Sequence, residues 1–264
     1  MPVEIVDPLP LDAFFRPMHW PAGTGALMTT RRGGTSVAPY DSLNLRAQTA
    51  DPLDQIAVAE NRRRFATTLG ATPVFLEQVH GTRVVRLDAA HTHPDAVTER
   101  ADASITTVPG IACTVLVADC LPVLFATRDG RAVGAAHAGW RGLAGGVLEA
   151  TVDALRAAVP VAAGDIVAWL GACIGPQRFE VGADVLAAFH EAEARHFVSA
   201  PARDGAPKWR ADLPGLAEGR LRRLGLTEVS SCGLCTASDA SRFFSFRRDR
   251  VTGRLAAAAW IEVA

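Results

Sequence analysis

The longest apolar run of the chain, between Ile111 and Ala126, is interrupted by one acidic residue, Asp119. The run is too short to cross a bilayer as a helix, and a charge near its middle would be costly there. The segments on either side, 111–117 and 121–127, instead have the length and apolar content of buried strands. We therefore expect a globular fold built on buried strands, with no membrane contact.

Strand patterns and helix patterns are mixed along the rest of the chain, without an internal repeat. Further strands are predicted at 25–30, 73–79, 82–87, 131–138 and 165–171. Helices are predicted at 51–70, capped by Asp51, and at 142–159, 183–197 and 213–224. Residues 88–100 and 199–208 are expected to be surface loops, and the tail a hairpin turning at Thr252-Gly253. No linker divides the 264 residues, so we predict one domain, residues 1–264, of the mixed α/β (α+β) class.

Charge and cysteine content narrow the function classes. Lys and Arg number 27 against 28 Asp and Glu, a net charge of -1 that predicts no nucleic-acid partner and no anionic membrane. Five cysteines are too few and too scattered for a disulfide framework. The first residues lack the basic start and apolar run of a signal peptide, so we expect a cytoplasmic protein with reduced thiols.

Three segments share one pattern, in which apolar residues lead to a side chain that can bind a metal and small residues follow. They are QVHG with His80, ADCLP with Cys120, and AAHAGWRG with His137. Two imidazoles and a thiolate are a known ligand set for catalytic zinc, and three ligands leave a fourth position open. Taken singly, however, a cysteine in an apolar run is commonly a small buried hydrophobe.

Longer motifs follow one another in a definite order: TTRRGGTS, PYDSLNL, QVHG, ADCLP, AAHAGWRG, GACIGP, FEVG and FFSFRRD. From about Ala26 to Trp260 they closely resemble the multicopper-oxidase-like polyphenol oxidase "laccase" family, whose members are also described as purine nucleoside phosphorylases. The resemblance implies layered mixed sheets with flanking helices and one catalytic zinc. Its His, Cys and His ligands fall on His80, Cys120 and His137.

The same resemblance implies phosphorolysis of adenosine, inosine, guanosine and methylthioadenosine, with adenosine deamination as a second activity. The partners would be purine nucleosides and phosphate, and the protein a monomer or weak homodimer. Copper is an alternative ion, and copper-dependent phenol oxidation an alternative activity. A laccase needs several copper centres, and seven histidines are few for that chemistry, so one Cys-His-His site suits zinc better.

Two further alternatives remain open. In a cysteine hydrolase or amidase, Cys120 and His137 would form a nucleophile–base pair with His80 as the orienting group. In a nucleotide-binding scaffold, the zinc would be structural. The open fourth coordination position argues against the scaffold, because structural zinc sites are normally closed by four ligands.

Residues that bind substrate or phosphate are expected among the polar side chains of these motifs: Arg31, Asn44, Gln78, Asp119, Arg141 and Arg248, with Arg247 as a neighbour of the last. Arginine suits phosphate because its guanidinium fork is bidentate. Asp119 is expected to act as acid or base or to orient an imidazole, with Glu180 as a second carboxylate. Trp140 is a candidate for stacking on a purine.

The chain departs from the family pattern at two places. Relatives often carry cysteine and tyrosine where this chain has Gln177, Arg178 and Phe179, and tyrosine where it has Phe246. The resemblance therefore carries over no role that needs the missing thiol or hydroxyl. The CxxC at 232–235 stands without a second pair, so we expect it to be structural.

Overall fold

The computed structural model describes residues 6–47, 52–93 and 95–263. Its strands are β1 (Phe14–Phe15), β2 (Thr24–Thr29), β3 (Thr72–Val74), β4 (Val84–Leu87), β5 (Ala103–Thr106), β6 (Ile111–Val117), β7 (Leu121–Thr127), β8 (Val133–Ala138), β9 (Ile166–Leu170), β10 (Glu180–Val181), β11 (Phe197–Arg203), β12 (Ala206–Ala211), β13 (Glu228–Ser231) and β14 (Leu255–Ile261). Its α-helices are α1 (Pro52–Leu69), α2 (Trp140–Gly145), α3 (Val147–Ala158), α4 (Ala183–Leu186), α5 (Leu213–Arg223) and α6 (Phe246–Asp249). Four short 3-10 helices join them: η1 (Leu11–Ala13), η2 (Ala89–Thr92), η3 (Ala163–Asp165) and η4 (Glu191–His196).

Two large mixed sheets pack against each other. The five-stranded sheet has the order β1-β2-β14-β6-β3, and the six-stranded sheet has the order β13-β9-β7-β8-β5-β4. Parallel pairs, such as β3 with β6 and β4 with β5, occur beside antiparallel ones. Every residue of β7 and β14 is buried, as continuous apolar strands require when both sheet faces are covered. The predicted mixed α/β class with layered sheets is confirmed.

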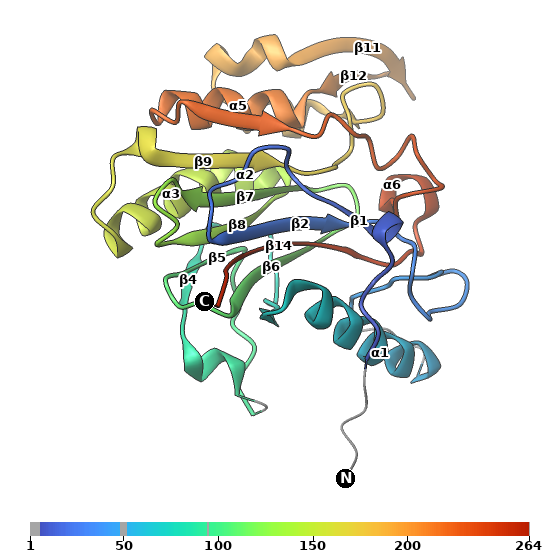
Figure 1. The fold of residues 1–264 in the computed structure, drawn as a ribbon. Helices are drawn as coiled ribbons and strands as arrows, with labels where there is room; N and C mark the ends of the chain where they lie inside the picture. Colours follow the sequence, from blue (N-terminus) through green and yellow to red (C-terminus); the bar gives the residue numbers. More distant parts are fainter. Residues whose placement is uncertain (1–5, 48–51, 94, 264) are drawn as a thin grey trace.

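Helices cover the outer faces of the two sheets (Figure 1). On the five-stranded sheet, α1 places Phe65 and Leu69 in one apolar cluster with Ala258. On the six-stranded sheet, α3 and α5 bury Leu148 and Leu221. The apolar spacing of α3 matches the helical repeat, which explains why the sequence predicts this helix well.

The chain crosses between the two sheets at the segment that interrupts the apolar run. Strand β6 ends at Val117 in the five-stranded sheet, and β7 starts at Leu121 in the six-stranded sheet. The turn between them places Asp119 at φ 103°, a conformation that L residues rarely adopt. Cys120 is thereby held at the boundary between the sheets.

A second crossing explains a prediction that was wrong. The strand expected at 73–79 is only Thr72–Val74, and the strand that follows the turn, Val84–Leu87, belongs to the other sheet. In the irregular segment between them, Glu77 forms an isolated backbone bridge with Arg100, and the N–H groups of residues 79–81 bind the side chain of Asp102. His80 lies in this segment with φ 60°, close to the crossing at Cys120.

Other element predictions were wrong where local pattern and packing disagree. The helix expected at 183–197 is only Ala183–Leu186, followed by a 3-10 turn. The loop expected at 199–208 is the β11–β12 hairpin, which joins β10 in a three-stranded sheet. The helix expected at 142–159 is broken in two at Gly146, whose φ is 100°.

The ends of the predicted elements also differ. In the tail, the first arm of the expected hairpin contains the short helix α6, and only β14 is a strand. Ile56, expected on the apolar stripe of α1, is 71% exposed, whereas Asp54 and Asn61 are buried. The predicted helix cap, Asp51, lies outside the described residues.

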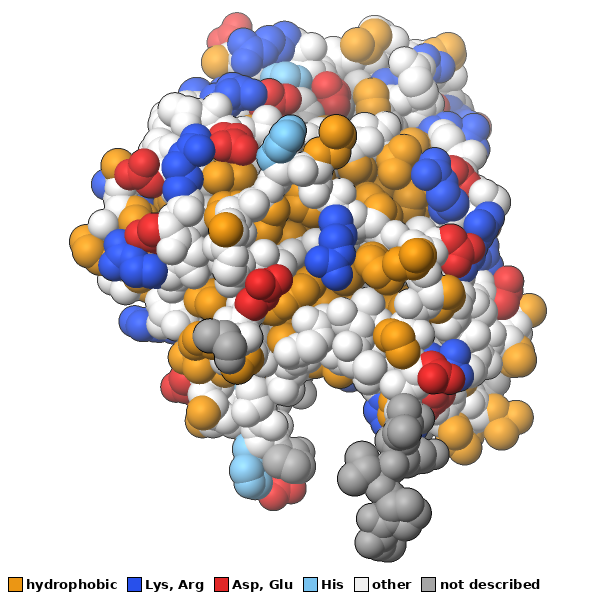
Figure 2. Space-filling view, viewed as in Figure 1, with side chains coloured by type: hydrophobic (Ala, Val, Ile, Leu, Met, Phe, Trp, Pro, Cys, Tyr) orange, Lys and Arg blue, Asp and Glu red, His pale blue; other side chains and the backbone are white. Residues whose placement is uncertain are grey.

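The molecular surface carries both signs of charge. On the face shown in Figure 2, basic and acidic side chains are interspersed around an apolar centre. Among the described residues, no helix is long and apolar enough to cross a membrane.

Candidate metal centre

The three predicted ligands meet at the two crossings. The ligand atoms of His80, Cys120 and His137 all lie within 4.8 Å of one another. Within the described part of the chain, they are the one group of three such residues placed to share an ion. His80 is exposed, Cys120 is half-buried and His137 is buried, so the site opens to solvent on one side.

Strand pairing brings two of the three ligands together. Cys120 immediately precedes β7, and His137 on β8 pairs with Pro122 of that strand. His80 arrives separately, from the irregular segment between β3 and β4. Its Nε2 lies 3.8 Å from the Sγ of Cys120, and its ring centroid lies 4.8 Å from that of His137.

A buried carboxylate, Asp102, holds the two histidines in place. One of its oxygens, Oδ1, lies 2.8 Å from Nδ1 of His137 and accepts the backbone N–H of His80 at 2.9 Å. The other, Oδ2, accepts the backbone N–H groups of Val79 and Gly81 at 3.0 and 2.7 Å. Because Asp102 engages Nδ1, His137 has Nε2 left to face an ion, as in carboxylate–histidine–zinc arrangements.

Two glycines of the AAHAGWRG motif are required by close packing. A Cβ at Gly139 would lie 2.9 Å from Cδ2 of His80 and 3.0 Å from Sγ of Cys120. A Cβ at Gly142 would lie 2.9 Å from the carbonyl oxygen of Gly81. Any larger residue at 139 would therefore press on two of the three ligands.

The geometry fits a tetrahedral zinc ion. With ordinary Zn–N and Zn–S bond lengths, the nitrogen and sulfur ligands of one zinc lie about 3.6 Å apart. The 3.8 Å between His80 Nε2 and Cys120 Sγ is close to that value. Three protein ligands and an exposed side leave room for a fourth ligand from solvent or substrate.

Electrostatics favour the ligand form of the thiol. Burial raises the pKa of Cys120, but the charge and hydrogen bonds of His137 and His80 outweigh it, and the pKa falls to about 6. Burial lowers the pKa of His137, but the thiolate and Asp102 outweigh it, and the pKa rises to about 9. Without an ion, the pair is therefore a thiolate and an imidazolium at neutral pH.

Two cavities meet at His80 and Cys120, and Ala118 and Phe246 also line both. The first, here called the apolar cavity, measures about 270 Å³ and is further lined by Asp119, Trp140, Arg141, Ile174, Phe179, Leu213 and Arg247. The second, the arginine cavity, measures about 380 Å³ and is further lined by Arg46, Leu76, Glu77, Gln78, Leu116, Val117, His137 and Arg254.

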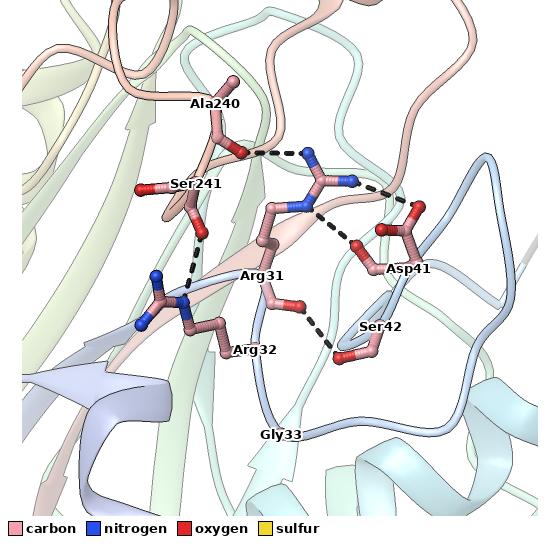
Figure 3. Close-up of a pocket in the computed structure, with 7 residues that line it drawn as sticks. All are labelled: Arg31, Arg32, Gly33, Asp41, Ser42, Ala240 and Ser241. Carbon is pink, nitrogen blue, oxygen red and sulfur yellow. Dashed lines mark hydrogen bonds and ion pairs between the residues drawn. The ribbon is translucent and has the colours of Figure 1, made fainter.

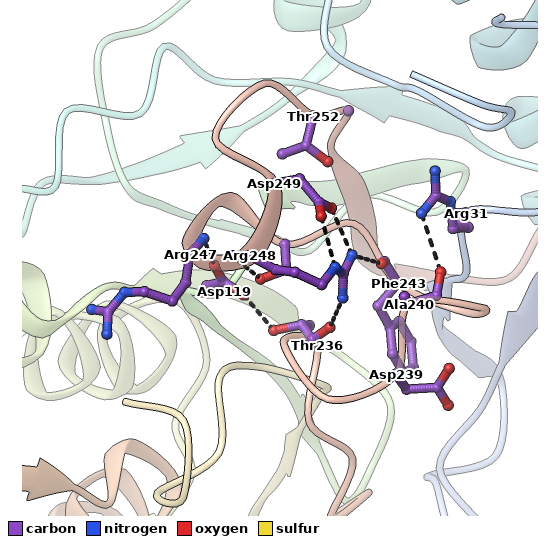
Figure 4. A network of polar contacts seen from close by, with 12 residues as sticks. Arg31, Asp119, Thr236, Asp239, Ala240, Phe243, Arg247, Arg248, Asp249 and Thr252 are labelled. Carbon is purple, nitrogen blue, oxygen red and sulfur yellow. Dashed lines mark hydrogen bonds and ion pairs between the residues drawn. The ribbon is translucent and has the colours of Figure 1, made fainter. Parts of the chain in front are cut away.

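Three of the predicted substrate residues line these cavities. Gln78 does so, but its amide is occupied by Leu116, whose O and N it binds at 2.8 and 2.7 Å. Asp119 is also engaged: it accepts from Thr236 and from the backbone N–H of Arg247, both at 2.6 Å (Figure 4). Arg141 is exposed and stacks on Trp140, with its Cζ 4.2 Å from the ring.

The other three predicted residues do not line either cavity. Arg31 lies in a separate surface pocket, where it binds Asp41 and the carbonyl of Ala240 (Figure 3). Arg248 binds the Asp249 carboxylate and the carbonyl oxygens of Thr236 and Phe243 (Figure 4). Asn44 is fully buried, and its Oδ1 accepts the backbone N–H groups of Arg46 and Arg254, two residues that line the arginine cavity.

Sequence reasoning missed Asp102, Arg46 and Arg254. Asp102 had one local signal, an acidic residue directly before an apolar strand. Arg254 had none, because it follows a Thr-Gly pair that is typical of a simple turn. Arg46 lies just after the PYDSLNL motif, yet only its packing against the C-terminal segment relates it to the site.

The fold and the site together define a class: a mixed α/β protein with one His-Cys-His centre at the meeting point of two sheets. The chain belongs to the family described as "Multi-copper polyphenol oxidoreductase laccase", whose sequence model matches residues 25–262.

Relatives extend over nearly the whole chain. It is 50% identical over 244 residues to a purine nucleoside phosphorylase of Pseudomonas aeruginosa, covering 92% of this chain and 95% of that protein. It is 46% identical over 243 residues to the purine nucleoside phosphorylase YfiH of Escherichia coli, covering 91% and 95%.

Among solved structures, a Neisseria meningitidis protein superposes with a TM-score of 0.85 at 40% identity, covering 95% of this chain and 100% of that one. YlmD from Geobacillus stearothermophilus superposes with a TM-score of 0.83 at 28% identity, covering 98% and 99%.

Proposed function

We propose that this protein is a zinc-dependent purine nucleoside phosphorylase that accepts adenosine, inosine, guanosine and methylthioadenosine, and that it also deaminates adenosine. The observation that carries the proposal is the position of His80, Cys120 and His137 between an apolar, aromatic cavity and a cationic one. A nucleoside and a phosphate need such a pair of neighbouring sites. The names of the similar proteins point to the same activity.

The apolar cavity suits the purine. Trp140 and Phe179 supply aromatic surface, and Ile174 and Leu213 add aliphatic surface that displaces water. In phosphorolysis, a phosphate oxygen bonds to C1′ of the ribose while the C1′–N9 bond breaks. The electron pair leaves with the purine, which gains a proton, and the products are ribose 1-phosphate and free base.

The three ligands would hold zinc where the two cavities join. When bound, zinc supplies a Lewis acid and a means of activating water at that position. Asp102 keeps the ring of His137 and the backbone of His80 oriented for the ion. Copper, with its affinity for thiolate and imidazole, is an alternative occupant of the same three side chains.

Deamination of adenosine requires a water and a proton acceptor beside the purine, with ammonia as the leaving group. Asp119 lines the apolar cavity, but both of its oxygens already accept hydrogen bonds. Glu77 is the carboxylate that lines the arginine cavity, and it pairs with Arg100 at 3.2 Å. A carboxylate oxygen can accept more than one hydrogen bond, so we place the proton acceptor for this second reaction at Asp119, the carboxylate on the purine's side.

A chromatographic nucleoside assay with and without phosphate tests the main proposal. We expect zinc to copurify in a one-to-one ratio, and free base to appear only with phosphate. Cys120→Ala should lose both zinc and turnover, whereas Cys232→Ala, at a half-buried thiol away from the ligands, should keep both. Full turnover by Cys120→Ala would reject the proposal.

A cysteine hydrolase is the second candidate, because the geometry also contains a Cys120–His137–Asp102 chain. Here Asp102, and not His80, orients the base. A chelator separates the two candidates, because it stops a zinc enzyme and spares a thiol nucleophile. All five cysteines are unpaired, as expected for the cytoplasmic location that we propose.

A further inference from the structure

Two arginines, Arg46 and Arg254, line the arginine cavity together with the ligands His80, Cys120 and His137. Arg46 lies on the loop that precedes α1, and Arg254 lies directly before β14. They are 208 positions apart in sequence, and neither belongs to a motif that carries the family resemblance. Their convergence is a product of the tertiary fold.

One buried side chain joins the two arginines. The Oδ1 of Asn44 accepts the backbone N–H of Arg46 at 3.2 Å and the backbone N–H of Arg254 at 2.9 Å. The Nδ2 of Asn44 donates to buried Asp54 at 2.9 Å, which fixes the orientation of the amide. A further backbone bond joins the N–H of Leu45 to the carbonyl of Arg254 at 3.1 Å. The spacing of the two arginines is thus set by a rigid, buried connection.

The charges on this pair are poorly neutralised. The guanidinium of Arg254 donates to the carbonyls of Thr252 and Gly253 through Nη1 alone, and that of Arg46 has no hydrogen bond or ion pair with any described residue. Burial and the charge of Arg46 lower the pKa of Arg254, and the negative charges of Cys120 and Asp119 offset this only in part. Glu77, the carboxylate that lines the same cavity, pairs with Arg100 at 3.2 Å, and two neighbouring cations favour an anion that joins them.

The pocket at Arg31 and Arg32 provides a contrast. Arg31 pairs with Asp41 at 3.2 Å and donates to the carbonyl of Ala240, and Arg32 donates to the carbonyl of Ser241 (Figure 3). Arg32 also pairs with Asp12 at 3.4 Å. Each of these two guanidinium groups is thus already paired with a carboxylate. In the arginine cavity, donors of both guanidinium groups remain available for a ligand.

We propose that Arg46 and Arg254 form the subsite for inorganic phosphate, with Asn44 as the residue that positions them. The assignment rests on the proposed phosphorylase function and says where its second substrate binds. His80, Cys120 and Phe246 line both cavities, so this subsite adjoins the cavity proposed for the purine. A phosphate there would lie next to the base-binding cavity, where it can reach C1′ of a nucleoside bound across the two.

Steady-state kinetics with the zinc-loaded enzyme test the subsite. Arg46→Gln is the first variant, because Arg46 is exposed and its side chain makes no bond that the fold needs. We expect the KM for phosphate to rise at least tenfold, with the KM for inosine changed less than threefold and zinc content unchanged. Arg254→Gln should act in the same direction. The control, Arg86→Gln on the exposed face of β4, should leave the KM for phosphate within twofold.

Direct binding of inorganic phosphate to the zinc-loaded protein, measured by calorimetry, separates the two hypotheses. If the wild type splits nucleosides but Arg46→Gln keeps its phosphate affinity and KM, the subsite is overturned and the phosphorylase function stands. If the wild type splits no nucleoside, yet phosphate binds and Arg46→Gln weakens it tenfold, the subsite stands and the phosphorylase function falls. For Asn44, Asn44→Ala should raise the KM for phosphate more than it lowers kcat, and an unchanged KM would refute its positioning role.

Discussion

Replacing Asp102 with asparagine keeps the shape of the side chain and removes its charge. The native carboxylate accepts from three backbone N–H groups and contacts His137. An amide has one accepting oxygen, so its NH₂ must face donors whichever way it turns. If it faces Val79 and Gly81, two hydrogen bonds are lost. If it faces His137, the imidazole must carry its proton on Nε2, the nitrogen needed for the ion.

The magnitude follows from the number of lost bonds. A buried hydrogen bond to a charged group contributes about 1.5–3 kcal/mol, so losing two destabilises the fold by roughly 3 kcal/mol or more. Loss of a group that orients a metal ligand typically weakens metal affinity about 10–100-fold. We expect Asp102→Asn to show both effects, because one carboxylate performs both tasks.

Zinc affinity is measured by competition with a chromogenic chelator, and stability by urea unfolding of the metal-free protein. Asp153→Asn, at an exposed position of α3, makes the same charge change without touching the site and is the matched control. A folded Asp102→Asn protein that binds zinc as tightly as the control would refute the orienting role of Asp102.

Three further predictions follow from the titrating groups. Iodoacetamide should alkylate metal-free protein at Cys120, whose pKa is about 6, at pH 7, and zinc should protect this thiol. Cys113, whose pKa burial raises to about 12, should stay unmodified. Mass spectrometry of peptides shows which thiol reacts, and faster reaction at Cys113 would contradict the assignment. Between pH 6 and 9 the Cys120 thiolate is already formed and His137 is protonated, so zinc binding should release one proton, and zinc affinity should rise about tenfold per pH unit. Calorimetry in buffers of different ionisation enthalpy tests this, and binding without proton release would contradict it. Glu193→Gln should cost about 3 kcal/mol in urea unfolding, because it leaves buried Arg220 with only the longer ion pair to Glu149, at 3.4 Å. Burial raises the pKa of Glu193, but Arg220 outweighs it and the pKa falls to about 2. The native pair's contribution should therefore be full above the unfolded pKa of about 4.3 and fade as pH falls towards 2.

Much of the fold is predictable because apolar periodicity is local. The runs at β6 and β7, the helix α3 and the helix α5 all carry their own patterns, and each forms close to where it is predicted. The wrong predictions fall where tertiary contacts override local pattern. The β11–β12 hairpin is one case: much of it is exposed, and only pairing with β10 makes it a sheet.

By itself, the sequence singled out the three candidate metal ligands, because each stands in a distinctive motif whose residue types suit the chemistry, and the structure brings them together. It also indicated that Gly139 and Gly142 flank the last ligand, although not why. The sequence did not indicate which distant side chains support the candidate ligands. Asn44 and Arg254 meet across 210 positions, and no local pattern records such a contact.

Only the tertiary structure decided that Asp102 orients two ligands and that Arg46 and Arg254 face the same cavity. The physical reason is that both arrangements lie in irregular segments outside the strand ladders. There, backbone N–H groups lack strand partners, and a buried side chain, Asp102 or Asn44, accepts them. Residue type and motif indicate a candidate metal ligand, whereas the role of a supporting residue depends on where the rest of the fold places it.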